Sequence, residues 1–184
     1  MSASPDQERW NRRYSLQAPS FRVSPLVSQL RAIDPPDGPV LEIACGTSGS
    51  ALEFAREGRR VVAVDVSDVA LNQLADEAAR LGVTDLIDLV EADAAAHPFT
   101  PRHFAIVLAT FFWDAAAFEH ACNAVTPDGV LGWQALASPV AGSRWRIPHG
   151  HLSAALPGDF GAVREFEGGA GPHAWTCLIA RRFG

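Results

Sequence analysis

Residues 40–49 read VLEIACGTSG, an apolar run that opens into a glycine-containing turn. Val40–Ala44 has the length and the unbroken apolar character of a strand that is covered on both faces of a parallel sheet. Gly46 and Gly49 follow, and glycine lets a backbone approach a ligand with no Cβ in the way. A strand, a glycine turn and a helix in this order are typical of nucleotide-like ligand sites in open α/β sheets.

Strands and helices alternate outward from this stretch. Helical patterns at 50–57, 67–81 and 114–125 separate apolar runs, and each helical pattern has a suitable cap or an amphipathic period. The predicted strands are Val40–Ala44, Val61–Val66, Leu86–Glu91, Phe104–Ala109, Gly129–Leu136, Ala162–Phe166 and Trp175–Arg181. The sequence therefore predicts an α/β fold, a Rossmann-like, doubly wound, mostly parallel seven-stranded sheet with a C-terminal antiparallel strand pair.

The length of 184 residues suits one domain. We expect a single unit over 1–184 with three parts. Residues 1–36 form an N-terminal helical cap segment, because Leu26, Val27, Leu30 and Ile33 share one helical face. Residues 40–136 form the cofactor-binding core, and residues 137–184 form a C-terminal hairpin with acceptor-side loops.

Composition excludes several classes of function. The net charge of −6 disfavours binding to nucleic acid, which needs a clustered basic face. All 15 basic residues are arginine, so lysine-based catalysis is excluded. The three cysteines are far apart and predict neither disulfides nor a metal site, which favours the cytoplasm. The sequence has no apolar run of membrane-spanning length, and we expect no membrane association.

Two carboxylates follow neighbouring strands at the edge where ligands bind in such sheets. Asp65 ends the second predicted strand, 19 residues after Gly46, where an acidic side chain can accept hydrogen bonds from both hydroxyls of a ribose. Asp93 follows the third strand and is placed to accept a hydrogen bond from an adenine amino group. The glycine turn and these acids together predict a nucleotide-like ligand.

In order and spacing, these residues resemble the class I S-adenosylmethionine (SAM) dependent methyltransferases. The likeness rests on VLEIACG from Val40, VDVS from Val64, Ala92-Asp93, FAIVL from Phe104 and TPDG from Thr126. WNRRY from Trp10 resembles the opening of the small tellurite-resistance-like methyltransferases, and LIARR from Leu178 resembles their tail. Ala44 and Ser48 replace two glycines that flank Gly46 in the fuller motif.

The resemblance implies SAM as cofactor and S-adenosylhomocysteine as product. By position, the implied cofactor-binding residues are Trp10, Arg13, Glu42, Ala44, Gly46, Asp65, Val66, Asp93, Ala94 and Thr110. Asp65 would bind the ribose, Val66 would pack on adenine, and Thr110 would lie near the methyl group. Arg13 would reach the carboxylate of SAM.

The acceptor side should lie after the fourth and fifth strands and against the N-terminal segment. Aromatic residues at these places are candidates to hold a small planar or hydrophobic acceptor: Phe111, Phe112, Trp113 and Trp145. The alternative role for the first three is packing at a helix start. His149 and His151 could supply a general base, which a methyl acceptor needs only when it must lose a proton. His149-Gly150-His151 has no evident third metal ligand.

Two other classes compete with a methyltransferase. A nicotinamide-dependent oxidoreductase would need a fuller GxGxxG and a catalytic Tyr/Lys pair or a substrate domain. Here lysine is absent and Tyr14 is the one tyrosine. A SAM-binding sensor or partner subunit without methyltransferase activity fits the same motifs. The sequence leaves open the acceptor, the methylated atom (O, N, S or metalloid) and the oligomeric state.

Overall fold

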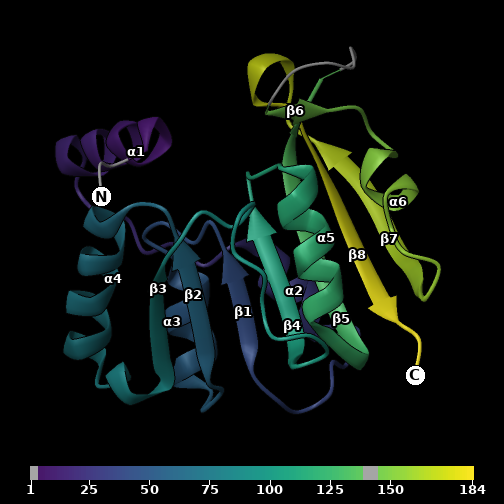
Figure 1. Ribbon diagram of the computed structural model, residues 1–184, viewed down its shortest axis with the longest axis horizontal. Coiled ribbons are helices and arrows are strands. Elements are labelled where there is room, and N and C mark those ends of the chain that lie inside the picture. Colours follow the sequence, from purple (N-terminus) through teal and green to yellow (C-terminus); the bar gives the residue numbers. More distant parts are fainter. Residues whose placement is uncertain (1–3, 139–144) are drawn as a thin grey trace.

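The computed structural model describes residues 4–138 and 145–184, which form one mixed sheet with helices on both faces (Figure 1). The strands are β1 (Val40–Ile43), β2 (Val61–Asp65), β3 (Ile87–Glu91), β4 (Phe104–Thr110), β5 (Val125–Ala137), β6 (Arg146–Ile147), β7 (Phe160–Gly168) and β8 (Trp175–Arg182). The helices are α1 (Pro5–Leu16), α2 (Pro25–Arg31), α3 (Gly49–Arg56), α4 (Asp68–Leu81), α5 (Ala115–Ala124) and α6 (His151–Ala154), with 3-10 turns at Thr84–Leu86 and Gly171–His173.

The strand order is β3-β2-β1-β4-β5-β8-β7, and β6 pairs with β5 beside this path. Strands β3 to β5 run parallel, whereas β8 is antiparallel to both β5 and β7. The chain moves outward from β1 to β3 and then returns to place β4 on the other side of β1. The topological switch point, where such sheets bind ligands, therefore lies between the carboxyl ends of β1 and β4.

The predicted α/β class and all seven predicted strands are confirmed. The additional strand β6 has only two residues, too few to show a period of two in the sequence. Helix α1 falls inside the predicted cap segment, but the sequence pattern did not resolve it. None of its 12 residues is buried, so it carries no apolar stripe. Ser4 at the N-cap and Pro5 at the first position mark where it begins.

Two apolar clusters cover the two faces of the sheet. On one face, Phe118 of α5 and Leu152 of α6 pack with Trp133 of β5. On the other, α2, α3 and α4 cover the sheet, with Leu30 and Phe54 fully buried. Leu26 and Leu30 of α2 lie directly above Gly132, so a side chain there would displace them. Burial on both faces accounts for the continuous apolar runs of β1 and β4.

Three helices begin at the carboxyl edge of the sheet, and each is capped by a side chain. Ser48 caps α3, Ser67 caps α4 and Asp114 caps α5. The remaining free N–H groups and the positive ends of the helix dipoles therefore face the edge that holds the switch point. Gly49 lets the chain at Phe21 and Arg22 cross the start of α3, because a Cβ there would overlap that backbone.

Within the described ranges, no helix has both the length and the apolar character needed to cross a membrane.

Candidate active site

Asp65 organises the centre of the carboxyl edge. It ends β2 in a buried position, and its two oxygens accept hydrogen bonds from different backbone groups. The Gly46 N–H donates to Oδ2 at 2.7 Å and the Ser67 N–H donates to Oδ1 at 2.8 Å. Burial raises the pKa of Asp65, while these N–H donors oppose that rise. A carboxylate has about four acceptor positions, so these backbone donors do not use all of them and capacity remains for a hydroxyl of a ribose. The residues present thus fit the adenosine part of SAM.

A hydrogen bond between Glu42 and Ser48 stabilises the glycine turn. Glu42 lies in β1 and is only 1% exposed, and the Ser48 hydroxyl lies 2.8 and 2.7 Å from its two carboxylate oxygens. The same hydroxyl accepts from the N–H groups of Ser50 and Ala51. Burial raises the pKa of Glu42 from 4.5 to about 7. Ser48, in the place of a glycine, therefore ties the turn to both the strand and α3.

The turn itself has left-handed backbone at two positions. Gly46 has φ +53°, and Ala44 has φ +52°, a conformation that is unfavourable for a residue with a Cβ. A Cβ at Gly46 would also overlap the Tyr14 hydroxyl, so Tyr14 of α1 sits directly on this glycine. Burial and the nearby charge of Asp65 raise the pKa of Tyr14, which keeps it a neutral phenol. Gly46 is required both for its backbone conformation and for the space it leaves.

Helix α1 covers the carboxyl edge through polar side chains. Asn11 accepts from the Ser67 hydroxyl at 2.7 Å and donates to Asp68 at 2.6 Å. Gln73 of α4 donates to the Tyr14 carbonyl at 3.2 Å. Gln7 donates to Glu91 at the end of β3. Figure 1 shows α1 above the ends of β2 and β3, next to the start of α4. These bonds place the helix over the site without an apolar interface.

The predicted adenine side lies after β2 and β3. Val66 is half-buried and follows Asp65, whose carbonyl accepts from the Ala92 N–H at 3.0 Å and so joins the two strand ends. Asp93 is exposed and accepts from the Ala95 N–H at 3.0 Å, while Ala94 is buried. The structure brings these residues together at one edge with Gly46.

On the acceptor side, the three consecutive aromatic residues after β4 differ in their surroundings. Phe112 and Trp113 pack into the core, where the Phe112 carbonyl accepts from Trp133 Nε1 at 2.8 Å. Trp113 is 9% exposed and contacts Phe118 at 5.6 Å between ring centroids. Phe111 is 58% exposed and has φ +54°, so it projects from the end of β4 in a left-handed conformation.

Three other residues predicted for the site are Thr110, His149 and His151, which lie at or after the ends of β4 and β6. Thr110 is half-buried at the last position of β4, opposite Gln134 of β5. The rings of His151 and Trp113 meet edge to face at 5.0 Å. His149 Nδ1 lies 3.0 Å from the hydroxyl of Thr176, a buried residue of β8. Both histidines are exposed and therefore available to solvent or to a ligand.

Trp10 contacts residues of both the predicted cofactor side and the predicted acceptor side. Its ring stacks on Tyr14 at 6.0 Å, and the guanidinium groups of Arg9 and Arg13 lie 5.1 and 5.2 Å from its centroid. Arg9 also lies 5.0 Å from the Trp145 ring, which joins α1 to the chain after β5. Among residues 4–138 and 145–184, no group of three or more His, Cys, Asp and Glu side chains could hold a metal ion.

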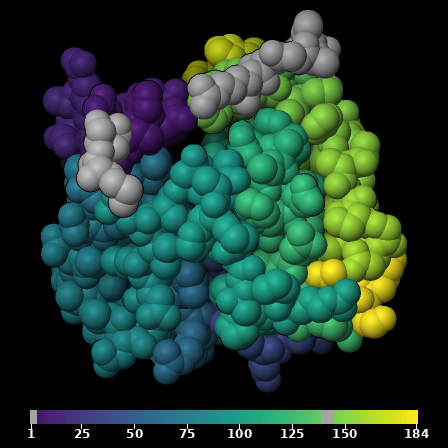
Figure 2. All heavy atoms as spheres, in the orientation of Figure 1, coloured from purple at the N-terminus to yellow at the C-terminus, as the bar shows by residue number. Residues whose placement is uncertain are grey.

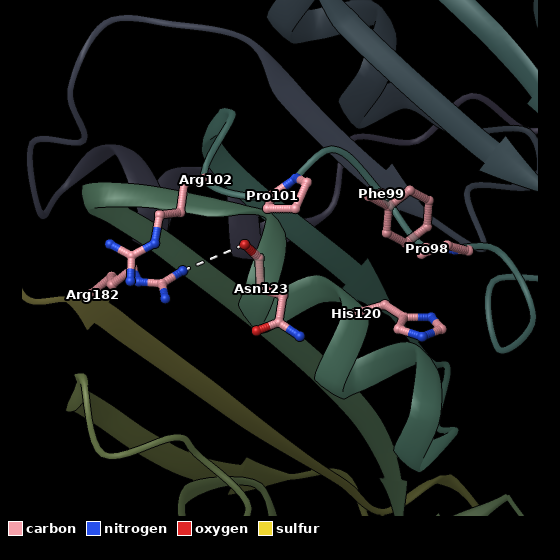
Figure 3. Close-up of a pocket in the computed structure, with 7 residues that line it drawn as sticks. All are labelled: Pro98, Phe99, Pro101, Arg102, His120, Asn123 and Arg182. Atoms are coloured by element: carbon pink, nitrogen blue, oxygen red, sulfur yellow. Dashed lines mark hydrogen bonds between the residues drawn. The ribbon is translucent and has the colours of Figure 1, made fainter.

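A cavity of about 330 Å³ lies at the opposite edge of the sheet (Figure 3). Its lining includes Phe99, Arg102, His120 and Arg182. Arg182 donates to Asp159 at 2.9 and 2.6 Å and to the carbonyls of Cys122 and Val125. These bonds satisfy the buried guanidinium and lock the end of β8 to the end of α5. This cavity is therefore built around a structural ion pair and is separate from the switch point.

Comparison with known proteins agrees with the geometry of the carboxyl edge. The fold, the glycine turn and Asp65 define a SAM-dependent methyltransferase, and residues 40–129 match the family model described as a methyltransferase domain. These findings support a class I SAM-dependent methyltransferase, an enzyme that uses SAM as cofactor. No curated protein sequence matches it.

Solved structures show the same fold at low identity. TehB from Haemophilus influenzae is 14% identical with a TM-score of 0.75, over 94% of this chain and 67% of that one. Geranyl diphosphate C-methyltransferase from Streptomyces coelicolor A3(2) is 13% identical with a TM-score of 0.76, over 98% and 100%. A protein from work on converting a disulfide bond into a thioacetal group during echinomycin biosynthesis is 19% identical with a TM-score of 0.74, over 97% and 92%.

Sequence reasoning did not assign a role to Tyr14 or Asn11, although both belong to the WNRRY stretch that carries the resemblance. Their positions depend on how α1 docks, and a helix with no buried residue gives no pattern that predicts its docking face. Thr176 was missed for a similar reason. It lies within a strand, and only the folded chain brings it to His149.

Proposed function

We propose that this enzyme transfers the methyl group of SAM to a small-molecule acceptor bound at the carboxyl edge, between the end of β4, the chain after β5 and helix α1. The proposal rests mainly on one observation. The buried carboxylate of Asp65, bonded to the glycine turn, shares its sheet edge with the exposed and strained aromatic residue Phe111. Strain of this kind persists where the surrounding structure holds it, and it concentrates at ligand sites.

On the cofactor side, we assign the ribose to Asp65 and the adenine edge to Asp93 and Ala94, with Val66 packed against the base. Gly46 gives the methionine portion room to approach the turn, whose shape Glu42 and Ala44 help to fix. Trp10, Arg13 and Thr110 complete the site, with Arg13 as the cation for the cofactor's carboxylate. When bound, SAM supplies a methyl group on a sulfonium, which is transferred by in-line displacement.

The chain's own contribution to the reaction is chiefly positioning. Holding an acceptor in line with a methyl group replaces an encounter in solution by an oriented contact, which can supply a large share of the rate. Phe111 and Trp145 are the surfaces that hold the acceptor, while Phe112 and Trp113 support them from the core. For an acceptor that must lose a proton, His149 is the candidate base, because Thr176 engages Nδ1 and leaves Nε2 to exchange the proton. His151, edge-on to Trp113, is the second candidate.

A small acceptor is favoured over a macromolecule. The net charge of −6 disfavours a nucleic acid, and the secondary structure of the described residues is accounted for by one sheet and its covering helices. We assign one domain to residues 1–184, with a cap at 1–36, a cofactor core at 40–136 and acceptor-side elements at 137–184. Cys45, Cys122 and Cys177 are free and buried, which supports a cytoplasmic location.

Calorimetric titration with SAM and S-adenosylhomocysteine tests the cofactor site, with Asp65→Ala alongside the wild-type protein. We expect micromolar binding that the substitution abolishes. Transfer of isotope-labelled methyl from SAM to a panel of small planar hydroxyl, amine and thiol compounds then tests the acceptor class. Binding without transfer to any small compound, but with transfer to protein or nucleic acid, would contradict the proposal.

A further inference from the structure

The short strand β6 marks the acceptor position. Leu136 of β5 pairs with Trp175 of β8 on one side and with Arg146 of β6 on the other. Strand β6 therefore lies on the side of β5 that β4 occupies earlier along β5. Strand β4 ends at Thr110, opposite Gln134, and Arg146 of β6 lies opposite Leu136. The partner of Arg146 on β5 lies two residues beyond Gln134, the partner of Thr110. Strand β6 therefore occupies the same position beside β5 as β4 does, and only Ala135 of β5 lies between the two paired stretches. Trp145, which precedes β6, thus lies next to the point where Phe111 leaves the sheet.

Arginine side chains of α1 bring positive charge to this point. The Arg9 guanidinium lies between two indoles, 5.1 Å from the Trp10 centroid and 5.0 Å from that of Trp145. Cation–π contacts of this kind hold the guanidinium plane without using its N–H donors. One Arg9 nitrogen lies 3.4 Å from Asp6, at a side-chain exposure of 50%. An arginine has five N–H donors, and among residues 4–138 and 145–184 Asp6 is the one ion-pair partner of Arg9, so donors remain for a ligand.

Phe111 supplies a second aromatic surface near this point. Its ring is exposed although the residue is large and apolar, and its left-handed φ of +54° aims the chain out of the sheet. Such a conformation costs about 1–3 kcal/mol in a residue with a bulky side chain, so its presence at the switch point indicates a ligand role. The space-filling view shows α1, in purple, above the same edge of the sheet (Figure 2).

We infer that the acceptor is a planar organic anion, stacked between Phe111 and Trp145, with its anionic group bound by Arg9. This inference rests on the proposed function and names the substrate class of the same site. A flat apolar body matches the exposed phenyl ring of Phe111 and the half-buried indole of Trp145, and a carboxylate, sulfonate or phosphate matches the guanidinium donors of Arg9. Asp6 approaches the same guanidinium at 3.4 Å, so the anionic group of the acceptor takes the donors that face away from Asp6.

A matched pair of ligands tests the charge. In the presence of saturating S-adenosylhomocysteine, 2-naphthoate and its neutral analogue 2-naphthamide are titrated by ligand-observed NMR. The two have the same ring system and nearly the same shape. We expect 2-naphthoate to bind about tenfold more tightly, because one charge-assisted hydrogen bond is lost in the amide. Arg9→Gln should remove this preference, whereas Arg12→Gln, an equal change of charge on the exposed side of α1, should keep it.

Trp145→Ala and Phe111→Ala test the stacking surfaces and should weaken both ligands by about tenfold. Equal affinities of the two ligands, no detectable binding of either, or a preference that survives Arg9→Gln would each overturn the inference. Calorimetry with S-adenosylhomocysteine on the same variants separates this outcome from failure of the proposed function. Loss of cofactor binding in the wild-type protein contradicts the function, whereas intact cofactor binding without a charge preference contradicts only the acceptor class.

Discussion

The cofactor half of the carboxyl edge, after β1 and β2, is held by hydrogen bonds between residues that lie 2 to 19 positions apart in the sequence. The proposed acceptor half, after β4 and β5, consists of large side chains from three distant segments, with Arg9, Phe111 and Trp145 as its main parts. The first half uses the backbone and short polar groups. The second uses ring surfaces and one cation. A cofactor common to many enzymes can be bound by local, repeatable geometry, whereas an individual acceptor is matched by long-range packing.

The largest expected effect is a loss of SAM affinity on substitution of Asp65. Asp65→Asn removes a charge that accepts two backbone hydrogen bonds and is assigned to the ribose, and hydrogen bonds to charged groups contribute about 1.5–3 kcal/mol each. We expect SAM binding to weaken by about 10²–10³-fold in calorimetry. Asp88→Asn, an exposed position on β3, is the matched control. An affinity within threefold of the wild-type value would exclude Asp65 from the ribose site.

Glu42→Gln tests the buried carboxylate beneath the glycine turn through the pH dependence of the free energy of unfolding. The folded protein holds the pKa of Glu42 at about 7, above its ordinary 4.5, so between these values the folded state binds more protons than the unfolded state. Stability from this group is present below about pH 4.5 and is lost as the pH rises through about 7. We expect the wild-type free energy of unfolding to fall relative to Glu42→Gln by about 3 kcal/mol over this window in urea titrations. Parallel pH curves for the two proteins would contradict the assignment.

Gly46→Ala tests the contact between the glycine turn and Tyr14 of α1. The new Cβ meets the Tyr14 hydroxyl and adopts φ +53°, so α1 must move away from the turn. We expect SAM to bind about tenfold more weakly, a loss of about 1.4 kcal/mol. The double variant with Tyr14→Phe removes the overlapping oxygen and should recover part of this affinity. If the second substitution gives no recovery, the loss comes from the backbone conformation alone.

Phe111→Gly should separate function from stability in the acceptor half. Glycine adopts φ +54° without strain, so we expect the free energy of unfolding to stay level or rise by about 1 kcal/mol. At the same time the affinity for 2-naphthoate should fall several-fold, because the stacking surface is lost. Phe183→Gly is a matched control, since Phe183 is also 58% exposed but lies at the opposite edge. A marked loss of stability in Phe111→Gly would show that the ring is structural.

The smallest effect concerns Ala44, whose φ of +52° is unfavourable for a residue with a Cβ. Ala44→Gly relieves that strain but increases the entropy of the unfolded chain, so a net gain of up to about 1 kcal/mol is expected. Ala79→Gly in the exposed face of α4 should instead destabilise by about 1 kcal/mol. Urea denaturation of both variants measures the difference. A loss of stability in Ala44→Gly similar to that of Ala79→Gly would contradict the role of strain.

Much of the fold could be predicted because burial on both faces leaves a continuous apolar signature in the strands. Val61–Asp65 and Phe104–Thr110 are examples, and each was predicted to within one residue at either end. Strand β6 and helix α1 were not resolved, since a two-residue strand and a helix without buried residues have no periodic pattern. The placement of Gly46 beside Asp65 could be expected from the parallel order of β1 and β2. The separation of Phe111 from Phe112 and Trp113 could not, since three adjacent aromatic residues look alike in sequence.

Local sequence patterns were enough to predict the α/β class, the strand that ends in the glycine turn, and the two acids near the ends of the next strands. Strand periodicity and turn chemistry are local properties, and the parallel sheet then brings the strand ends to one edge. Only the tertiary structure decided that Tyr14 covers Gly46, that Thr176 meets His149 and that Arg9 lies between Trp10 and Trp145. These contacts join segments far apart in the chain, and their energies come from packing that no local pattern encodes.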